Sequence, residues 1–510
     1  MQRYLNPRNL GLSALLASLL AVAGCSLAPV YQVPDAAVPA AFKEAAGADG
    51  APPAVSADGA WKTAAPSDQL ARGEWWTVFE DAALDALERQ AIDANQNLKA
   101  ALARVKEARA LRQSARAALF PDLNAGFGPT RERVSPASQG LPAAADVPAQ
   151  TLWRAQATAS YEVDLFGRVS DSVAAATAEA AQSEALMRGV LLALQADVAQ
   201  NYFNLRELDA EQALFARTVR LREDALRLVQ SRFDAGAISE LDIARAKAEL
   251  ATARSDAMTV ARQRAAAEHS LAVLLGQTPA QFAVAPSPLA PVAVRIPAGL
   301  PSALLERRPD IAAAERAMAA ANARVGVARA AFFPSLSLTG AGGFESATLG
   351  DLFKWSSRAF LLGPLAGTAL TVPLFDGGRR AGNLAGARAA YEEDVANYRQ
   401  QVLQAFREVE DALSDLRILA SQTQTQADAV SASGRAAQLS RTQYTEGAVN
   451  YLDVIDAERT VLQAQRAATQ LAGLQAVATV NLIRSLGGGW GPGQPGQGAS
   501  AAAVEEVAAR

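Results

Sequence analysis

Alternation of apolar and polar residues with a period of two is clearest between Trp153 and Leu165, where thirteen consecutive residues alternate. The apolar positions are Trp153, Ala155, Ala157, Ala159, Tyr161, Val163 and Leu165. Successive side chains of a strand point to opposite faces, so this stretch predicts a strand with one apolar and one wetted face. Trp153 and Tyr161 lie about 26 Å apart along such a strand, a separation that suits the two aromatic girdles of a membrane barrel. This strand alone does not exclude a half-buried hairpin of a soluble protein.

Three further stretches alternate in the same way. The expected strands cover about residues 121–134, 150–166, 335–345 and 360–374. In the last of them, one face carries Phe360, Leu362, Leu370, Val372 and Leu374. The pattern therefore predicts four amphipathic strands per chain.

Between the strands the apolar spacing changes to three and four residues, which is typical of helices that pack along one face. A first helix is expected from Asp81 to the Phe120-Pro121 step, where proline ends it. Two long helices are expected at about 168–235 and 379–446, each roughly 100 Å long at about 1.5 Å per residue. The other expected helices cover about 239–276, 303–331 and 450–486.

The helical stretches occur twice, 211 residues apart, since the segment Phe233–Asp242 recurs as Tyr444–Asp453. In each copy a glycine, Gly236 or Gly447, is expected in the left-handed conformation that ends a helix. Asn450 is expected to cap the next helix, with Asp453 as its capping-box partner. The match continues without a gap to the helix ends, so the chain is predicted to contain two copies of one unit.

Composition narrows the function classes. The 510-residue chain is 50% hydrophobic but only 6% aromatic, which suits closely packed long helices better than a large aromatic core. Its net charge of −4 and the lack of an uninterrupted basic run give no argument for nucleic-acid binding. With one His and one Cys, a zinc site, a catalytic triad or a disulfide framework is not expected. The sequence has no phosphate-binding Gly-Lys-Ser/Thr loop and no nucleophile–base pair, so neither an enzyme nor a cofactor is expected.

The N-terminus resembles a bacterial lipoprotein signal. Two arginines precede an apolar run of about twelve residues, shorter than the roughly 20 that a membrane-spanning helix needs. The run ends in Val22-Ala23-Gly24-Cys25, which resembles a lipobox. Residues 1–24 are therefore expected to be a signal peptide, and the resemblance implies that Cys25 is the lipidated mature N-terminus. Ser26 after it fits sorting to the outer membrane in such lipoproteins. The alternative is an unused thiol.

Proline and glycine set the remaining boundaries. Residues 25–80 are expected to form an extended, lipidated N-terminal segment. A proline-rich linker at 277–302 separates the first copy, 81–276, from the second, 303–487. The Gly- and Ala-rich residues 488–510 are expected to be disordered.

Four strands cannot close a barrel, and open sheet edges cannot face lipid because every backbone polar group there must be paired. If the strands are membranous, the chain must oligomerise, and a trimer would supply 4 × 3 = 12 strands. We therefore expect a mainly α fold with a transmembrane β-barrel, in which long helical hairpins form a hollow tube.

Several motifs together resemble one family. They are the lipobox, the tandem repeat, Trp75-Trp76, Phe333-Pro334, Arg308-Pro309-Asp310-Ile311 and Leu374-Phe375-Asp376-Gly377-Gly378-Arg379. The family is the outer-membrane factors of tripartite efflux systems, the TolC-like group, nearest to its OprM/NodT lipoprotein branch. The resemblance covers about residues 25–487. It implies a homotrimer with a 12-stranded outer-membrane barrel and a periplasmic α-barrel. It also implies a passive exit duct, docked through a periplasmic adaptor (membrane fusion) protein to an inner-membrane transporter of the RND type.

The resemblance also implies site residues. Both helical turns would lie at the periplasmic tip, with Gly236, Ala237, Gly447 and Ala448 as the adaptor-docking surface. Leu452 resembles the apolar constriction of a closed iris and Asp456 its aspartate ring, while Tyr444 and Arg459 resemble the polar contacts that keep it shut. Three Asp456 carboxylates around one axis would hold counter-cations and narrow the pore electrostatically. The alternative for Asp456 is a solvated carboxylate that the helix dipole favours.

One position departs from the family pattern. Position 445 is Thr, where relatives often carry a basic residue that locks the gate. Arg245 stands in copy one where Asp456 stands in copy two, and we hypothesise that the two face each other across neighbouring helix pairs. For Arg308-Pro309-Asp310-Ile311 a structural role as a helix start is expected.

Two rival functions remain open on the sequence alone. A diffusion porin needs many short strands, whereas helix dominates this sequence. A helical scaffold lipoprotein would not need the thirteen-residue amphipathic strand. Nothing in the sequence specifies a cargo.

Overall fold

The computed structural model describes residues 26–35, 38–39, 41–44, 73–140, 142, 146–290, 303–362 and 369–488. The chain divides into two units, each built from three stretches. Unit 1 comprises residues 1–35, 105–183 and 314–398, and unit 2 comprises residues 36–104, 184–313 and 399–510. Four helices pass from one unit into the other, so each contributes to both.

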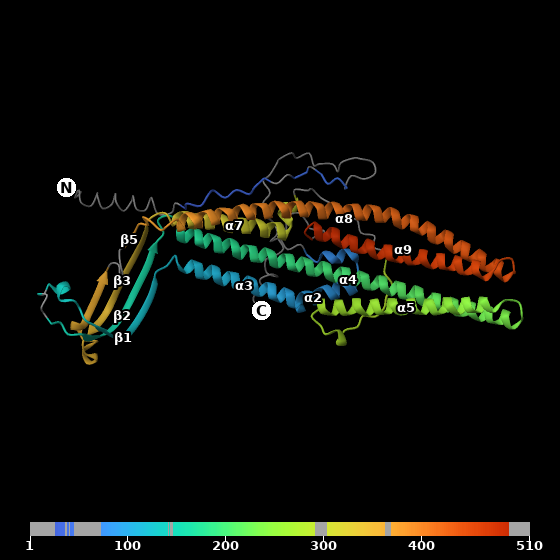
Figure 1. The fold of residues 1–510 in the computed structure, drawn as a ribbon, viewed down its shortest axis with the longest axis horizontal. Coiled ribbons are helices and arrows are strands. Elements are labelled where there is room, and N and C mark those ends of the chain that lie inside the picture. The colour runs from blue at the N-terminus through green and yellow to red at the C-terminus, as the bar shows by residue number, and fades with distance from the viewer. Residues whose placement is uncertain are drawn as a thin grey trace, which may run out of the picture. The chain divides into compact units, whose positions relative to one another are not determined.

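Unit 1 contains an antiparallel sheet (Figure 1). Its strands are β1 (Asp122–Glu132), β2 (Gln150–Val163), β3 (Ser335–Ser346), β4 (Arg358–Leu362) and β5 (Leu370–Thr371). They lie in the order β1-β2-β3-β4, and β5 also pairs with β3. The first three strands lie within a few residues of the ranges that the alternation predicted.

The fourth expected strand, 360–374, is wrong as one continuous element. Its described parts form β4 and β5, which both pair with β3. Gly340 lies opposite Leu362, whereas Leu336 lies opposite Leu370. The chain between the two pairings therefore contains four residues more than a continuous strand would need. Residues 363–368 within it lie outside the described residues.

The register of the sheet confirms the predicted separation of apolar and polar faces. Ala155 of β2 lies opposite both Phe127 and Phe344, and Tyr161 lies opposite Leu338. The apolar face thus carries Leu123, Ala125, Phe127, Trp153, Ala155, Ala157, Ala159, Tyr161, Leu336, Leu338, Phe344 and Phe360. On the other face Arg154 forms ion pairs with Glu132 at 3.2 Å and Glu345 at 2.7 Å. Because those partners lie on β1 and β3, the pairs tie three strands together.

Eight α-helices lie within the described ranges. They are α2 (Ala82–Ala94), α3 (Gln96–Ala117), α4 (Arg168–Asp234), α5 (Glu240–Leu274), α6 (Ala303–Arg307), α7 (Pro309–Ala330), α8 (Arg379–Thr445) and α9 (Tyr451–Ser485). α7 begins at Pro309, the helix start expected there. None of the described helices is both long enough and apolar enough to cross a membrane.

The expected single helix from Asp81 to Phe120 is wrong, because Asn95 divides it into α2 and α3. Asn95 is buried and has extended backbone angles. Its side-chain oxygen accepts from the backbone N–H of Leu98 at 3.0 Å, which caps α3. Its amide nitrogen donates to the carbonyl of Leu274, at the end of α5, at 2.9 Å. The break is therefore stabilised by a contact distant in sequence.

The expected extended segment 25–80 is wrong at its C-terminal end. Trp75–Phe79 form a short 3-10 helix, in which Trp75 and Trp76 are almost fully buried. The indole nitrogen of Trp75 donates to the side chain of Gln195 on α4 at 2.9 Å. The expected signal peptide 1–24, Cys25, linker residues 291–302 and tail residues 489–510 lie outside the described residues.

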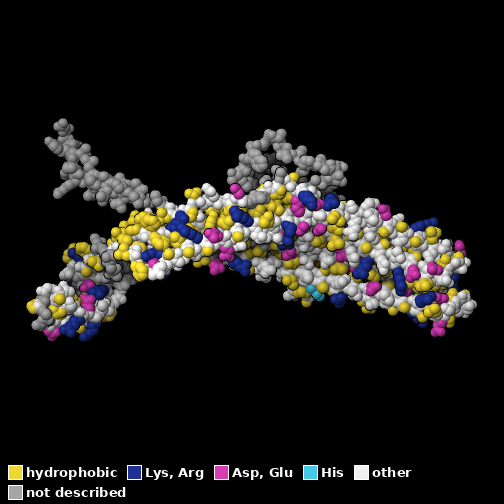
Figure 2. Space-filling model, turned by 45° about the horizontal axis from the view of Figure 1, so that its top comes forward, with side chains coloured by type: hydrophobic (Ala, Val, Ile, Leu, Met, Phe, Trp, Pro, Cys, Tyr) yellow, Lys and Arg dark blue, Asp and Glu magenta, His cyan; other side chains and the backbone are white. Residues whose placement is uncertain are grey.

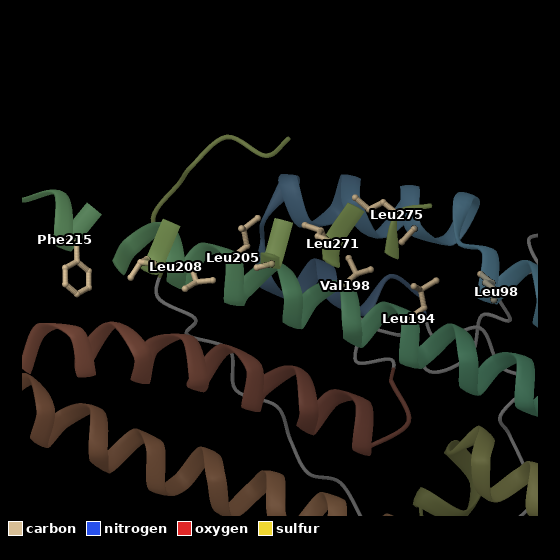
Figure 3. Close-up of a cluster of buried hydrophobic side chains, with 11 residues drawn as sticks. Leu98, Leu194, Val198, Leu205, Leu208, Phe215, Leu271 and Leu275 are labelled. Atoms are coloured by element: carbon tan, nitrogen blue, oxygen red, sulfur yellow. The ribbon is translucent and has the colours of Figure 1, made fainter. Parts of the chain in front are cut away.

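The core of unit 2 lies along α4 (Figure 3). Apolar residues spaced by three and four positions on α4 contact α5 and the first turns of α3. The labelled members are Leu98, Leu194, Val198, Leu205, Leu208, Phe215, Leu271 and Leu275. The helical seam that the spacing predicted is thus buried.

Candidate functional site

Two helical hairpins in unit 2, α4–α5 and α8–α9, end in turns of the same design (Figure 1). In the first, the N–H of Gly236 donates to Phe233 at 2.8 Å and that of Ala237 to Arg232 at 2.9 Å. In the second, Gly447 donates to Tyr444 at 3.1 Å and Ala448 to Gln443 at 2.8 Å. This bond pair is the Schellman motif, which needs a left-handed residue at its centre.

The two central glycines have φ values of +74° and +80°, as the sequence predicted. Each donor and acceptor of the first turn lies 211 residues before its counterpart. The same holds at the far helix ends, where Gly276 and Gly487 are also left-handed. The backbone N–H of Asn450 donates to the Asp453 carboxylate at 3.1 Å, as expected for the capping box. The tandem repeat is therefore confirmed in the hydrogen bonds of the turns.

A small apolar cluster joins the two turns. It consists of Val229, Ile243, Ala246, Tyr444, Tyr451, Val454 and Ile455. The rings of Tyr444 and Tyr451 lie 5.5 Å apart, and burial raises the pKa of Tyr451 to about 12. The Tyr444 hydroxyl is buried and has no hydrogen-bond partner in the described part of the chain. Within one chain, Tyr444 therefore acts as a packing residue rather than as a polar contact.

Arg232, in the last turn of α4, crosses to the other hairpin. Its guanidinium donates to the carbonyl oxygens of Tyr444 at 3.1 Å and Thr445 at 2.9 Å. It also lies 4.6 Å from the centre of the Tyr444 ring. A cation at the carboxyl end of a helix is favoured by the helix dipole. Arg232 thus supplies a basic group beside position 445, which is itself occupied by Thr.

Five charged residues form what we call the tip ion-pair network: Arg222, Glu249, Arg441, Glu458 and Arg459. Arg222 of α4 pairs with both Glu458 and Glu249, the latter at 3.5 Å. Glu458 also pairs with Arg441 at 2.6 Å, and Glu249 pairs with Arg459. The bond to Glu249 raises the pKa of Arg459. All four helices of the two hairpins contribute.

This network is not duplicated by the repeat. The residues 211 positions away are Ser433, Thr460, Gln230, Lys247 and Ala248. Of these only Lys247 is charged, so no equivalent ion pair can form among them. Arg222 to Glu458 and Arg459 to Glu249 both join one copy to the other. The side chain of Arg222 is only 4% exposed, so loss of both partners would leave a buried charge uncompensated.

The residues implied as the constriction lie on the exposed side of α9. Leu452 is 42% exposed, and its counterpart Leu241 on α5 is 57% exposed. The Asp456 side chain is 65% exposed and lies 4.0 Å from Arg459. Arg245 lies 3.6 Å from Asp242 of its own helix. Within one chain the hypothesised Arg245–Asp456 pair is therefore not formed, and a pair between neighbouring chains stays a prediction.

The other site residues lie in unit 1 or beyond the described part of the chain. Trp153 stacks on Phe127 with ring centres 6.0 Å apart, at one end of the apolar face, and Tyr161 lies toward the other end of β2. Cys25 precedes the first described residue. Among the described residues, no group of three or more His, Cys, Asp or Glu side chains could hold a metal ion.

Sequence reasoning missed Arg222, Arg232, Glu249, Arg441 and Glu458. Charged residues on long helices are usually solvated, and nothing in their spacing separates these from their neighbours. One signal was available for Arg232, since a basic residue in the last helical turn is a helix-end signal. Its reach to the other hairpin depends on the tertiary packing.

Comparison with known proteins gives a consistent result. Residues 87–277 and 300–488 match the family model described as outer membrane efflux protein. Outer membrane protein OprJ of Pseudomonas aeruginosa is 36% identical over 487 residues, covering 95% of this chain and 97% of OprJ. Cation efflux system protein CusC of Escherichia coli is 33% identical over 476 residues, covering 92% of this chain and 97% of CusC.

Solved structures agree with this. The outer-membrane channel OprN has a TM-score of 0.81 at 31% identity, covering 91% of this chain and 100% of that one. The open state of the MtrE outer membrane channel of Neisseria gonorrhoeae has a TM-score of 0.75 at 30% identity, covering 91% of this chain and 98% of that one. The matches cover nearly the whole length of both channels.

Proposed function

Because the chain belongs to the family of outer membrane efflux proteins, we propose that it is the outer-membrane exit duct of a tripartite efflux pump. The observation that carries the proposal is the pairing, in one repeat-built chain, of an amphipathic sheet with two long hairpins that end in matched turns. A duct of this kind needs no catalytic group, and its energy would come from the inner-membrane transporter, most simply one of the RND type. Relatives of similar identity are named for cations and for toluene, so the cargo is left open.

The open edges of the sheet support a homotrimer. In one chain β1 forms one edge, and β4 with β5 forms the other. Unpaired edges facing lipid would leave backbone N–H and C=O groups unsatisfied. Pairing β1 of one copy with β4 and β5 of the next removes every edge and gives 4 × 3 = 12 strands if β4 and β5 count as one. Trp153 and Tyr161 would then lie in the aromatic girdles.

Lipidation at Cys25 is supported by the residues that follow it. The Ser26 hydroxyl donates to Asp171 at 2.6 Å, and the carbonyl of Pro29 accepts from Asn322 at 2.9 Å. A side chain on Gly167, between β2 and α4, would lie 2.7 Å from the Ser26 Cα. Ser26, the residue that would follow a lipidated Cys25, thus lies at the junction of β2 and α4.

The two turns are proposed as the periplasmic tip. Gly236, Ala237, Gly447 and Ala448 would form the adaptor-docking surface, and Leu452 with Asp456 would line the closed iris. Arg459 pairs with Glu249, and Tyr444 packs in the small apolar cluster that joins the two turns, so both would keep the hairpins of one chain together. Opening on docking would then move the hairpins as a unit or break the tip ion-pair network.

The iris assignment is tested by single-channel recording of the purified trimer in planar bilayers. Asp456→Ala should raise the conductance, because it removes a ring of carboxylates that binds cations and narrows the pore. Asp428→Ala is the matched control, since Asp428 is also an exposed carboxylate on a long helix. Equal conductance of the Asp456 variant and the wild type would contradict the assignment.

The docking surface is tested by photo-cross-linking from a cysteine placed at Ala448 or Ala237 in the cell. The only native Cys is the proposed lipidation site, so the introduced thiol would be the one free thiol of the mature chain. Capture of a periplasmic adaptor from these positions, and not from a cysteine at Ser421 on α8, is the expected result. Capture from Ser421 alone would contradict the tip as the docking surface.

A further inference from the structure

Arginines mark the helix ends that adjoin the sheet in unit 1. α3 and α7 each carry an arginine at the penultimate position, Arg116 and Arg329. α4 and α8 each begin with arginine, at Arg168 and at Arg379-Arg380. Because β1 and β3 follow α3 and α7, and β2 and β5 precede α4 and α8, all these arginines lie at the junction of helices and sheet.

Exposed apolar residues lie between these arginines and the strands. Phe120 is 66% exposed, and Leu374 and Phe375 are each 91% exposed. Phe332 and Phe333 are also exposed, at 43% and 41%. Figure 2 shows hydrophobic side chains gathered at the helix ends nearest the sheet, with basic side chains beside them. Large aromatic groups are left in solvent only at a cost unless another surface covers them.

The order of these residues is duplicated in the sequence. Arg116-Ala-Ala-Leu-Phe-Pro121 enters β1, and Arg329-Ala-Ala-Phe-Phe-Pro334 enters β3. In both, a cation comes first, bulky apolar groups follow three and four residues later, and the strand begins after proline. Toward the sheet, a cationic residue is thus followed by apolar residues. Across a membrane surface, phosphate groups are followed in the same order by acyl chains.

The arginines differ in whether their guanidinium groups form hydrogen bonds or ion pairs. Arg168 pairs with Glu162 at the strand end, and Arg380 with Asp376 at 3.1 Å. Arg329 donates to the carbonyl of Leu27 at 3.2 Å. Arg116 and Arg379 are exposed, and neither guanidinium forms a hydrogen bond or ion pair within the described part of the chain, although Arg379 interacts electrostatically with Asp376. Each of these two arginines is four residues from an exposed aromatic residue, Phe120 or Phe375.

Two carboxylates at the junction, those of Asp164 and Asp376, accept mainly from backbone N–H groups. Asp164 accepts from the backbone N–H groups of Val169 and Ser170 at 3.0 and 2.7 Å. Asp376 accepts from those of Gly378 and Arg380, both at 3.1 Å, besides pairing with the Arg380 side chain. Both acids thus cap helices α4 and α8, and neither forms an ion pair with Arg116 or Arg379.

We infer that this junction, which we call the arginine–aromatic collar, binds the headgroups of anionic phospholipids in the membrane leaflet next to the helices. The inference rests on the proposed function, because it takes the apolar face of the sheet as the lipid-facing one. Arg116 and Arg379 bind phosphate through the planar guanidinium fork. The apolar groups of residues 119–120, 332–333 and 374–375 cover the adjoining ester and first acyl carbons.

The test uses the purified, lipidated trimer in nanodiscs or detergent and counts bound lipid by native mass spectrometry. Phosphatidylglycerol is titrated against phosphatidylethanolamine. The wild type should retain phosphatidylglycerol preferentially, and 1 M NaCl should weaken the retention because it shortens the screening length to about 3 Å. Arg116→Gln combined with Arg379→Gln should lower the apparent affinity by about fivefold for each arginine, which corresponds to about 1 kcal/mol per cation near an anionic surface.

The matched control is Arg217→Gln combined with Arg262→Gln. Both of these arginines are exposed on helices of unit 2 and distant in sequence from the sheet. An equal loss of phosphatidylglycerol in this control would overturn the inference, as would equal retention of the two lipids by the wild type. So would a collar variant that loses trimer stability without losing lipid preference. Channel conductance of the wild type, recorded in parallel, tests the proposed function separately.

Discussion

Buried ionisable groups of unit 2 are accommodated in two ways. The Asp209 carboxylate is almost fully buried and accepts from Arg206 at 3.0 Å, Arg264 at 2.7 Å and the backbone N–H of Ser287 at 3.0 Å. Glu88 on α2 is also fully buried, yet neither of its carboxylate oxygens has a hydrogen-bond partner in the described part of the chain. Burial, with a smaller contribution from Asp85, raises the pKa of Glu88 to about 9. Glu88 is therefore a neutral acid in the folded protein at pH 7.

This state makes folding depend on pH. In the unfolded chain Glu88 ionises near pH 4.5, whereas in the folded chain it keeps its proton up to about pH 9. The contribution of protonated Glu88 to the stability of the fold is complete below its pKa in the unfolded chain. It is lost as pH rises through its pKa in the folded chain. Glu88→Gln, an uncharged substitute of the same shape, should flatten this dependence between pH 5 and 9. The slope removed is at most about 1.4 kcal/mol per pH unit.

The measurement is the unfolding temperature of the detergent-solubilised protein at several pH values. The wild type should lose stability relative to Glu88→Gln as pH rises, and the two should converge near pH 5. Glu107→Gln, at an exposed position on α3, is the control and should follow the wild type. Parallel curves for Glu88→Gln and wild type would show that Glu88 is ionised when folded.

At the scale of elements, the hairpin turns are determined locally. Gly447 closes α8 through two backbone bonds and has space around it, since a side chain there would meet no atom within 4 Å. Its φ of +80° alone restricts the residue type, because a Cβ clashes with its own backbone in the left-handed region. The same reasoning applies to Gly236. The two positions are therefore sensitive to conformation and not to packing.

Gly447→Ala should accordingly destabilise the α8–α9 turn by about 1 kcal/mol. Gly434→Ala is the matched comparison, because Gly434 lies inside α8 and also has open space around it. That change should stabilise the helix by about 0.5–1 kcal/mol. Amide hydrogen exchange near residue 447 measures both. If both substitutions shifted exchange in the same direction, the backbone explanation would be wrong.

The long helices and the sheet faces could be predicted because each depends on a pattern sustained over many residues. The three-four spacing at Leu194, Val198 and Leu205 and the alternation around Ala157 are set by the chain itself. The break at Asn95 could not, because its side chain contacts Leu274, 179 residues away. The division of the fourth strand depends likewise on its pairing with β3.

The same limit applies to the candidate site. The turns at Gly236 and Gly447 were predictable because a left-handed glycine and a cap residue act within a few positions. The tip ion-pair network was not, since Arg222 meets Glu458, 236 residues away, only when the two copies pack. Resemblance to a family supplied Leu452 and Asp456. Their roles depend on neighbouring chains, so they stay predictions.

At the scale of the whole molecule, the proposed barrel requires a definite orientation of the sheet. Ala157 lies midway along β2 on the apolar face, opposite Ala125 and Gly342. Thr158 is its neighbour on the polar face, opposite Asn124 and Ala341. In a closed trimer the first would contact lipid and the second would line the channel. Adjacent residues therefore distinguish the two environments.

Ala157→Arg should lower the yield of membrane-inserted trimer, because a cation at the lipid face near the bilayer midplane costs about 2–4 kcal/mol per chain. Thr158→Arg should insert normally, since its guanidinium would remain in water, and should shift the ion selectivity of the channel toward anions. Heat-resistant trimer on gels and reversal potentials in planar bilayers measure the two effects. A Thr158 variant as damaged as the Ala157 variant would contradict a water-filled interior. If Ala157→Arg were harmless, the apolar face would not contact lipid. The sheet orientation on which the trimeric duct depends would then be wrong.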